Sequence, residues 1–447
     1  MFGLPDRLAA RSEPVRVGVI GAGTFGQQFV GQVAGIEGLR IAGIADLDLE
    51  RATDALSIGN ANPIERAESS SAVAEAVEAG RRIVTDDATA LIESDVDVVL
   101  EATGIPEAGA RHAYEAILND TDVVMASVEA DTVVGPTLAR FAEAADVVYA
   151  HAYGDQPALT IEMVEWARTA GFEVIAAGQG RDFREQDRYG TPEDALERFG
   201  FTEEYLADAD PNPKLYNSFM DGTKLAVESC AVANAVGFPP DTLGMHTPTA
   251  EIEEIPDLFR PSESGGILED TGIVDVVSTV YPDGSTTEIG FPFGIFVVVR
   301  APNERVRQHL HLGIGGGDGV ITSSDGEYAL FYRPYHLPGV ETAISVANAA
   351  VYDQPTGTAC DRVAEVVAAA KRDLDPGEEI DGGGGETVYG LVERAEAAAA
   401  DDHVPLELLD GAEVRRPVEE DEVLSIEDVE LDRDSFLYTL RDLDGGR

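Results

Sequence analysis

The sequence predicts an α/β protein with a doubly wound N-terminal domain, a central α+β domain and a small β-rich module at the C-terminus. From Val15 to Ala150, short β-branched runs alternate with Ala- and Glu-rich amphipathic stretches, as strands and helices do around a parallel sheet. After Asp155 this alternation ends, and a chain of 447 residues is too long for one ordinary domain. The expected domains span residues 13–155, 156–360 and 361–447.

The expected strands of the first domain are short and mostly apolar, as buried parallel strands are. They are Val15–Ile20, Leu39–Ala45, Arg82–Thr85, Val96–Glu101, Asp122–Ala126 and Val147–Ala150. The polar segment Leu56–Ala67 interrupts the alternation and is expected to be a loop insertion.

The rest of the chain mixes helical and strand-like segments around a polar, aperiodic stretch from Arg181 to Pro213. The expected helices are Leu159–Thr169, Asn217–Val236 and Asp361–Lys371, and the expected strands are Phe172–Ala177, Ile273–Val280 and Gly294–Arg300. Gly313–Gly319 could form a lid, a phosphate-binding nest or a plain turn. The Gly- and Glu-rich segment Asp373–Arg447 is expected to be a compact β module.

A dinucleotide fingerprint follows the first expected strand. Residues Gly21–Gly26 read GAGTFG and open a helix, and Asp46 ends the second strand twenty residues later. The first glycine permits the tight turn, the second lets the backbone approach a pyrophosphate, and the third lets helix and strand pack closely. This pattern predicts a Rossmann domain that binds NAD or NADP. The candidate cofactor-binding residues are Gly21, Gly23, Thr24, Phe25, Gly26, Asp46, Thr103 and Gly104.

The choice between NAD and NADP stays open. Asp46 would accept a hydrogen bond from a ribose 2′-hydroxyl, which favours NAD, whereas Arg51 is near enough in sequence to face a 2′-phosphate. Thr103 and Gly104 follow the fourth strand, and strand carboxyl ends line the cofactor crevice in this fold. A plain turn between strand and helix is the alternative interpretation for these two residues.

Composition excludes several classes of partner. The net charge of −53 makes nucleic acid a poor partner. The basic residues comprise 28 arginines and 3 lysines, and this balance on a diffusely acidic surface is typical of halophilic proteins. No apolar run is long enough to span a membrane and the start lacks a signal peptide, so we expect a cytoplasmic protein. Two cysteines are too few for a disulfide framework.

The scarcity of lysine directs attention to the lysines that occur. Lys214 and Lys224 lie within eleven residues of each other, and lysine can exchange a proton near neutral pH where arginine cannot. Lys371, at the end of an expected helix, is predicted to be a solvated charge. We therefore expect Lys224 to carry the proton in a hydride transfer, and Lys214 is a second catalytic candidate.

Polar residues recur around Lys224 at helical spacing. If Asn217–Val236 is one helix, Asn217, Asp221, Lys224 and Glu228 share a face. An ion-pair ladder on the surface is the alternative, but the apolar flanks favour a polar stripe that faces a cleft. Asp221 and Glu228 are then expected to orient Lys224 or to hold the substrate, and Asn217 to contact substrate.

A second candidate cluster lies near residue 333. Arg333 offers a bidentate clamp for a carboxylate or phosphate, and His336 offers an acid or base. Tyr335 and Glu341 complete the expected substrate-binding set. A buried network that only joins two segments is the alternative. His246 and His311 are weaker candidates, and a divalent ion held by acidic residues together with substrate oxygens stays open.

These motifs together resemble the homoserine-dehydrogenase-related oxidoreductases that carry a C-terminal SAF domain, which include the 1-deoxy-D-xylulose 5-phosphate reductoisomerase-like enzyme. The motifs are the fingerprint, Asn212-Pro213-Lys214, Asp221–Lys224, Ala233-Asn234-Ala235, Met245-His246, Arg333–Leu337 and Thr387–Gly390. The resemblance covers nearly the whole chain and implies a SAF module from Asp361 onward, NADPH as cofactor and a homo-oligomer. Gln179 stands where relatives carry a lysine, which leaves a phosphate contact in question.

The expected function is an NAD(P)-dependent oxidoreductase acting on a small hydroxylated carbonyl or alcohol substrate. Three alternatives stay open: a reductoisomerase-like activity, homoserine dehydrogenase, and a non-catalytic scaffold that senses a dinucleotide or binds a saccharide. The retained lysines favour an enzyme over a scaffold.

Overall fold

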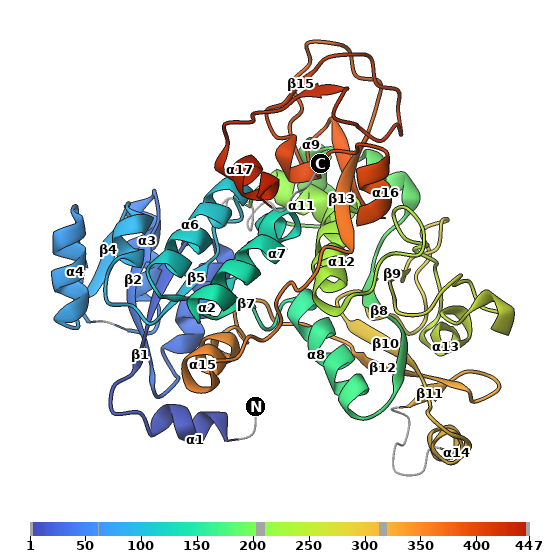
Figure 1. The fold of residues 1–447 in the computed structure, drawn as a ribbon, viewed down its shortest axis with the longest axis horizontal. Coiled ribbons are helices and arrows are strands. Elements are labelled where there is room, and N and C mark those ends of the chain that lie inside the picture. Colours follow the sequence, from blue (N-terminus) through green and yellow to red (C-terminus); the bar gives the residue numbers. More distant parts are fainter. Residues whose placement is uncertain (1–2, 61, 203–210, 313–319, 444–447) are drawn as a thin grey trace. The chain divides into compact units, whose positions relative to one another are not determined.

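The computed structural model describes residues 3–60, 62–202, 211–312 and 320–443. The chain divides into two compact units (Figure 1). The first unit comprises Met1–Leu159, Leu337–Cys360 and Thr439–Asp444, and the second comprises Thr160–His336, Asp361–Tyr438 and Gly445–Arg447. The glycine run Gly313–Gly319 lies outside the described residues, so its expected role as a lid, nest or turn stays a prediction.

The first unit is built on a seven-stranded parallel sheet in the order β3-β4-β2-β1-β5-β6-β7. The strands are β1 (Val15–Ile20), β2 (Leu39–Ala45), β3 (Ile64–Arg66), β4 (Arg82–Thr85), β5 (Val98–Glu101), β6 (Asp122–Met125) and β7 (Tyr149–His151). The strand order reverses its direction between β1 and β5, so the topological switch point lies at the carboxyl ends of these two strands. The expected doubly wound domain is confirmed.

Helices connect these strands. They are α1 (Leu4–Ala9), α2 (Thr24–Val33), α3 (Leu49–Ser57), α4 (Ser70–Glu78), α5 (Ala88–Ile92), α6 (Pro106–Leu118) and α7 (Val128–Ala145). The expected loop insertion at Leu56–Ala67 is wrong in part, because β3 lies inside it and pairs with β4 in register. The short strand contains charged residues at an edge of the sheet, which masks its strand character in the sequence.

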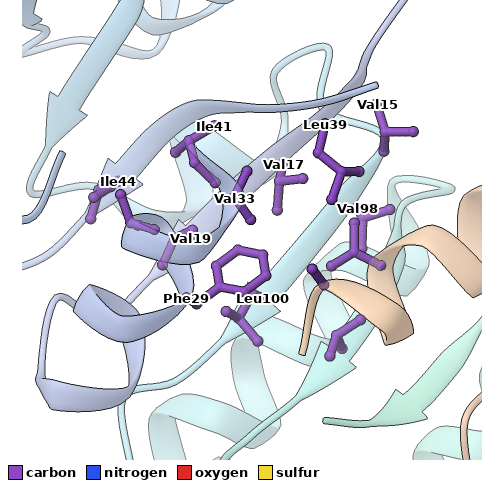
Figure 2. Packing of buried hydrophobic residues seen from close by; sticks show 14 of the residues in the cluster. Val15, Val17, Val19, Phe29, Val33, Leu39, Ile41, Ile44, Val98 and Leu100 are labelled. Carbon is purple, nitrogen blue, oxygen red and sulfur yellow. The ribbon is translucent and has the colours of Figure 1, made fainter. Parts of the chain in front are cut away.

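The core of the first unit forms where α2 packs on the central strands. Phe29 is fully buried and its ring lies among the strand side chains of this cluster (Figure 2). Burying one such side chain contributes roughly 1.5–3 kcal/mol. The same core includes Ala343 and Val346 of α15 (Ala343–Tyr352), so this late segment packs with the first unit. The boundaries at residues 155 and 360 stay predictions.

The second unit contains a mixed five-stranded sheet in the order β11-β12-β10-β8-β9, which confirms the expected α+β texture. Its strands are β8 (Glu173–Arg181), β9 (Ile273–Ser278), β10 (Ile295–Arg300), β11 (Ile321–Thr322) and β12 (Tyr328–Arg333). Only β8 and β9 pair in parallel among the described strands of this sheet. β8, β9 and β12 therefore end on the same side of the sheet, where β10 begins. Their last residues are Arg181, Ser278 and Arg333.

The remaining helices frame or follow this sheet. They are α8 (Gln156–Thr169), α9 (Pro192–Arg198), α11 (Pro213–Met220), α12 (Thr223–Val236), α13 (Ile255–Leu258) and α14 (Glu304–His311). The single helix expected over Asn217–Val236 is wrong. Gly222 adopts a left-handed conformation with φ 89° and separates α11 from α12, with Asp221 at the C-cap of α11.

The C-terminal module is rich in strands, as expected. Its strands are β13 (Ala364–Ala370), β14 (Val388–Arg394), β15 (Glu413–Val414) and β16 (Val429–Glu430), with the short helices α16 (Ala395–Ala400) and α17 (Phe436–Asp442). The helix expected over Asp361–Lys371 is wrong, because this Ala-rich segment forms β13 and pairs antiparallel with β14 along its whole length. Tertiary pairing overrides the helical propensity of alanine here.

None of the helices in the described part of the chain combines the length and the apolar character that crossing a membrane requires.

Candidate functional site

The fingerprint loop has the geometry of a dinucleotide cradle. At Gly21, φ is 99°, and a Cβ atom would lie 2.5 Å from the carbonyl oxygen of Ala102. At Gly26 a Cβ atom would lie 2.2 Å from the carbonyl oxygen of Gly21. At Gly23, by contrast, a Cβ atom would meet nothing within 4 Å. Two glycines are therefore required by the fold itself, while the third opens onto empty space.

That space lies at the start of α2, where anions bind well. Gly23 is the N-cap of α2 and provides no side chain to satisfy the first N–H groups, and Thr24 is exposed and Phe25 half-buried in the first turn. Unpaired N–H groups and the helix dipole together favour a phosphate at this position. The loop therefore fits the pyrophosphate of a dinucleotide.

Asp46 ends β2 and is held on several sides. Its carboxylate accepts hydrogen bonds from the backbone N–H groups of Ala22 at 2.7 Å and Asp48 at 2.8 Å, and pairs with Arg51 at 2.8 Å. The Asp46 side chain is 6% exposed, whereas that of Arg51 is 51% exposed. The next residue, Leu47, is 89% exposed, an unusual position for a large apolar side chain. A cationic and an apolar side chain thus flank the carboxylate expected to face the ribose.

Thr103 and Gly104 follow β5 on the other side of the switch point. The Thr103 hydroxyl donates to Glu101 at 2.5 Å, and the Gly104 N–H donates to the hydroxyl of Ser127 at 2.9 Å. Gly104 has φ 68° and open space where a side chain would be. This turn lies beside the fingerprint loop because β5 pairs with β1. Its contact with a cofactor stays a prediction.

A buried polar group at the carboxyl ends of β5 and β7 was not predicted from the sequence. Glu101, Asp131 and His151 are each at most 1% exposed. The Tyr149 hydroxyl donates to Asp131 at 2.8 Å, and Nε2 of His151 lies 3.6 Å from the second oxygen of Asp131. Burial, followed by the nearby charge of Asp131, raises the pKa of Tyr149. The sequence does contain one indication of this group, because the otherwise apolar strand β5 ends in the charged residue Glu101.

In the second unit, Lys224 lies in the first turn of α12 and is 8% exposed. The preceding turn is fixed by Asp221, which is fully buried and accepts a hydrogen bond from the Thr223 N–H at 2.8 Å. The Thr223 hydroxyl in turn accepts a hydrogen bond from the Gly390 N–H in β14 at 2.9 Å. The start of α12 is therefore braced against the C-terminal module.

Lys371 corrects an expectation, because it is buried rather than solvated. Its ammonium group lies 2.8 Å from Asp221 and donates to the carbonyl oxygens of Gly190 and Gly385, both at 2.7 Å. Burial raises the pKa of Asp221, and the charge and hydrogen bond of Lys371 oppose this rise. Asp221 thus pairs with Lys371, which directly follows β13 and lies 150 residues further along the chain.

The residues near Lys214 hold the glycine-rich turn Gly382–Gly385. The Lys214 ammonium group donates to the carbonyl oxygen of Asp381. The Asn217 amide donates to the carbonyl oxygens of Gly190, Gly384 and Gly385 at 2.9–3.3 Å. Both side chains therefore have structural partners, and the catalytic contact expected for Lys214 and the substrate contact expected for Asn217 stay predictions.

Glu228 in α12 pairs with Arg181 at the end of β8. The two side chains are 3.2 Å apart and both are buried. The Arg181 guanidinium also lies 5.7 Å from the ring of Phe219 and 5.9 Å from that of Phe293. Asp221 and Glu228, two members of the expected stripe, thus each belong to a buried ion pair, and their roles beside Lys224 stay predictions.

The second expected cluster is partly brought together. Arg333 stacks on Tyr335 at 4.5 Å, and Nδ1 of His336 lies 2.7 Å from the carbonyl oxygen of Phe293. These residues lie near the same strand ends as Arg181, because β10 pairs antiparallel with both β8 and β12. Glu341 belongs to the first unit, so its expected role beside Arg333 stays a prediction.

The weaker histidine candidates have partners of their own. Nδ1 of His246 lies 2.7 Å from the buried carboxylate of Asp275, and Nε2 lies 3.7 Å from Asp241. The hydrogen bond to Asp275 raises the pKa of His246. Nδ1 of His311 lies 3.1 Å from the Thr322 hydroxyl at the exposed end of α14.

Comparison with protein families assigns each part of the chain separately. Residues 21–152 match the family described as homoserine dehydrogenase, NAD binding domain. Residues 154–342 match the family described as oxidoreductase DRL, catalytic domain, and residues 365–430 match the SAF domain. No curated protein matches the chain.

Solved structures include distant neighbours. A dehydrogenase from Chromobacterium violaceum is 12% identical with a TM-score of 0.39, and the match covers 77% of this chain and 90% of that one. A myo-inositol dehydrogenase from Lactobacillus casei, solved with NAD(H) and myo-inositol, is 16% identical with a TM-score of 0.27, covering 41% of this chain and 50% of that one. At these values the neighbours carry no argument about function.

The fold, the cradle and the family matches define the class of protein. The chain is an NAD(P)-dependent oxidoreductase with a homoserine-dehydrogenase-type dinucleotide-binding domain. It carries in addition a DRL-type catalytic domain and a C-terminal SAF domain.

Proposed function

We propose that this oxidoreductase transfers a hydride to or from a small hydroxylated carbonyl or alcohol substrate, and that Lys224 carries the proton of the reacting hydroxyl. The observation that carries the proposal is a buried lysine in the first turn of α12, in a chain with only 3 lysines. A lysine can release and take up a proton near neutral pH, which an arginine cannot. Lysine is rare in this chain, so its presence at this buried position supports such a role.

The other two lysines contact the turn before α12 and the C-terminal module. Lys371 neutralises Asp221, and Lys214 donates to the carbonyl oxygen of Asp381. Asp221 and Glu228 act in this proposal as positioning residues: Asp221 fixes the turn before α12, and Glu228 holds Arg181 against the same helix. Removal of either group is expected to act on the reaction through the placement of α12.

The cofactor would be held by the first unit. Gly21, Gly23 and the first turn of α2 would receive the pyrophosphate, Asp46 and Arg51 the adenosine ribose, and Thr103–Gly104 would lie on the other side of the switch point. The nicotinamide ring, when bound, supplies or accepts the hydride. Lys224 takes up or returns the hydroxyl proton at its Nζ atom.

The substrate is proposed to carry a negative charge. Arg181 is the last residue of β8 and Arg333 the last residue of β12, and both strands end on the same side of the second sheet. His336 lies beside them. Guanidinium groups bind carboxylate and phosphate in a bidentate manner. Arg333 stacks on Tyr335 next to His336, so we assign the anionic group to Arg333, with Tyr335 and His336 as the walls of its site.

We propose NADPH as the preferred cofactor. Asp46 already accepts two backbone hydrogen bonds, and its negative charge is offset by Arg51. The exposed guanidinium of Arg51 can turn toward a 2′-phosphate, which adds a charge-assisted contact that NADH lacks. The preference for NADPH therefore depends on Arg51.

The test is a turnover assay of the full chain in molar KCl, a medium chosen because the acidic composition predicts a need for salt. Nicotinamide absorbance is followed with NADPH or NADH and a panel of hydroxy acids, polyols, homoserine and sugar phosphates. Turnover of a small anionic hydroxyl or carbonyl compound supports the proposal. Tight cofactor binding without turnover of any panel member contradicts it and favours the scaffold.

One outcome would redirect the assignment within the oxidoreductases. If a phosphorylated ketose is rearranged as well as reduced, the reductoisomerase-like alternative gains support, and the role of Lys224 in simple hydride transfer is wrong. Turnover of homoserine alone would favour homoserine dehydrogenase. Product analysis by NMR separates these outcomes, because a rearranged carbon skeleton cannot arise from hydride transfer alone.

A further inference from the structure

Three side chains with metal-binding atoms converge in the C-terminal module, far along the chain from Lys224. Glu393, Asp401 and His403 each offer one such atom, and these atoms all lie within 4.8 Å of one another. Glu393 is buried, His403 is half-buried and Asp401 is exposed. The group is thus anchored at one end and open to solvent at the other.

The local fold explains why they meet. Glu393 lies near the end of β14, and α16 follows this strand directly. The helix ends at Ala400 with Asp401 as its C-cap, Asp402 adopts a left-handed conformation with φ 54°, and the His403 N–H donates back to the Ala398 carbonyl oxygen at 2.9 Å. This reversal returns His403 to the strand, where its Nδ1 lies 2.8 Å from Oε2 of Glu393.

The electrostatic surroundings favour a cation. Glu365 lies directly opposite Glu393 in the β13–β14 ladder, and residues opposite one another share a face of the sheet. Arg362 pairs with Glu365 at 3.0 Å, and His403 pairs with Glu393. Glu393 and Asp401 thus place two carboxylates beside His403, in a protein whose overall charge is −53.

We propose that Glu393, Asp401 and His403 bind a divalent transition-metal ion of the Zn²⁺ class. One imidazole nitrogen and two carboxylate oxygens are ligands that Zn²⁺ accepts, and three protein ligands leave a fourth position for water. With bonds of about 2.0–2.2 Å, neighbouring ligand atoms around a tetrahedral ion lie roughly 3.4 Å apart. The separations here, 2.8 Å for one pair and at most 4.8 Å for any, bracket that value.

The ion would brace the reversal after α16 against the end of β14. It would not take part in hydride transfer, so this inference does not rest on the proposed function. The small adjustment that tetrahedral geometry requires falls mainly on Asp401, because that side chain is exposed and can rotate. The hydrogen bond between His403 and Glu393 would be replaced by two bonds to the ion.

The experiment is calorimetric titration of the full chain with Zn²⁺, after removal of metals by a chelator, at pH 7.5 in concentrated KCl. We expect one saturable site. The variants Asp401→Asn and His403→Gln should each weaken binding by roughly 10-fold or more, since even changes outside the ligand shell cost metal sites 10–100-fold. Lowering the pH should weaken binding as well, because protons compete with the metal ion for its ligand atoms.

Matched controls are available close to the site and away from it. Asp402→Asn changes the neighbouring exposed acid, and asparagine tolerates the left-handed conformation at that position. His309→Gln changes an exposed histidine of α14. Both should bind Zn²⁺ as the parent protein does. If the parent does not bind, or if Asp401→Asn and His403→Gln bind as well as the controls, the proposed site is wrong; should His403→Gln fail to fold, Asp401→Asn decides.

Discussion

The ammonium group of Lys371 lies 2.8 Å from the carboxylate of Asp221, and the two side chains are 2% and 0% exposed. This ion pair joins the turn before α12 to the end of β13. Taking both charges out of water is costly, and the Gly190 and Gly385 carbonyl oxygens offset part of that cost by accepting hydrogen bonds from Lys371. The pair is therefore sensitive to the loss of one partner.

Replacement of Lys371 by methionine should destabilise the protein by about 3–5 kcal/mol, because it leaves the Asp221 carboxylate buried without its counter-charge. Denaturant unfolding in constant KCl measures the change. The control is Arg372→Met, the adjacent residue, whose pair with Glu378 is 48% and 36% exposed and should contribute less than about 1 kcal/mol. Equal effects of the two substitutions would contradict the importance of the buried pair.

Lys224→Ala should lower kcat by roughly 10²–10⁴-fold, the range that positioned acid–base groups contribute, and leave cofactor affinity unchanged. Lys224→Arg keeps the positive charge but cannot release a proton, so it should lose a comparable share of kcat. Steady-state kinetics and cofactor titration measure the two quantities. An active Lys224→Arg enzyme would show that charge, and not proton exchange, is what this position supplies.

The fingerprint glycines should respond to substitution in two different ways. Gly23→Trp fills the open space at the start of α2 and should abolish NADPH binding, measured by fluorescence titration, in a protein that stays folded. Gly26→Ala places a Cβ atom 2.2 Å from the Gly21 carbonyl oxygen and should destabilise the fold by about 1–3 kcal/mol. Undiminished NADPH binding by Gly23→Trp would mean that the cofactor does not use this loop.

Arg51→Ala should weaken NADPH binding by roughly 10-fold or more, because a charge-assisted contact contributes about 1.5–3 kcal/mol, and should leave NADH binding nearly unchanged. Asp46→Ala should weaken NADH more than NADPH if the carboxylate holds the 2′-hydroxyl. Parallel titrations of both cofactors on both variants measure the two ratios. Equal losses of NADH and NADPH in Arg51→Ala would remove Arg51 as the determinant of preference.

His246 should make stability depend on pH. The hydrogen bond to Asp275 raises the pKa of His246 above its usual value, so the protonated form is favoured in the folded state. This stabilisation is fully present below the unfolded pKa of about 6.5 and is lost as the pH rises through the higher folded value. Thermal unfolding of the parent protein and of His246→Gln across this range should differ in slope, and parallel curves would contradict the assignment.

Local signals in the sequence determined the first domain and its cofactor loop. The alternation of strands and helices, the glycine spacing of Gly21–Gly26 and the acid at Asp46 are short-range patterns, so each could be recognised without knowledge of distant contacts. Steric demands at Gly21 and Gly26 act within one turn of the chain or across adjacent strands. The class of protein could therefore be predicted before the structure.

Only the tertiary structure decided the partners of the polar residues and the state of the Ala-rich segment before Lys371. Ala364–Ala370 favours a helix by propensity, but pairing with β14 makes it a strand and carries Lys371 to Asp221. Asp221 and Lys371 are 150 residues apart, as Glu228 and Arg181 are 47 apart. A buried charge requires a partner of opposite charge, and the fold can supply that partner from any part of the chain. The spacing of residues along the sequence therefore does not reveal which residue the partner is.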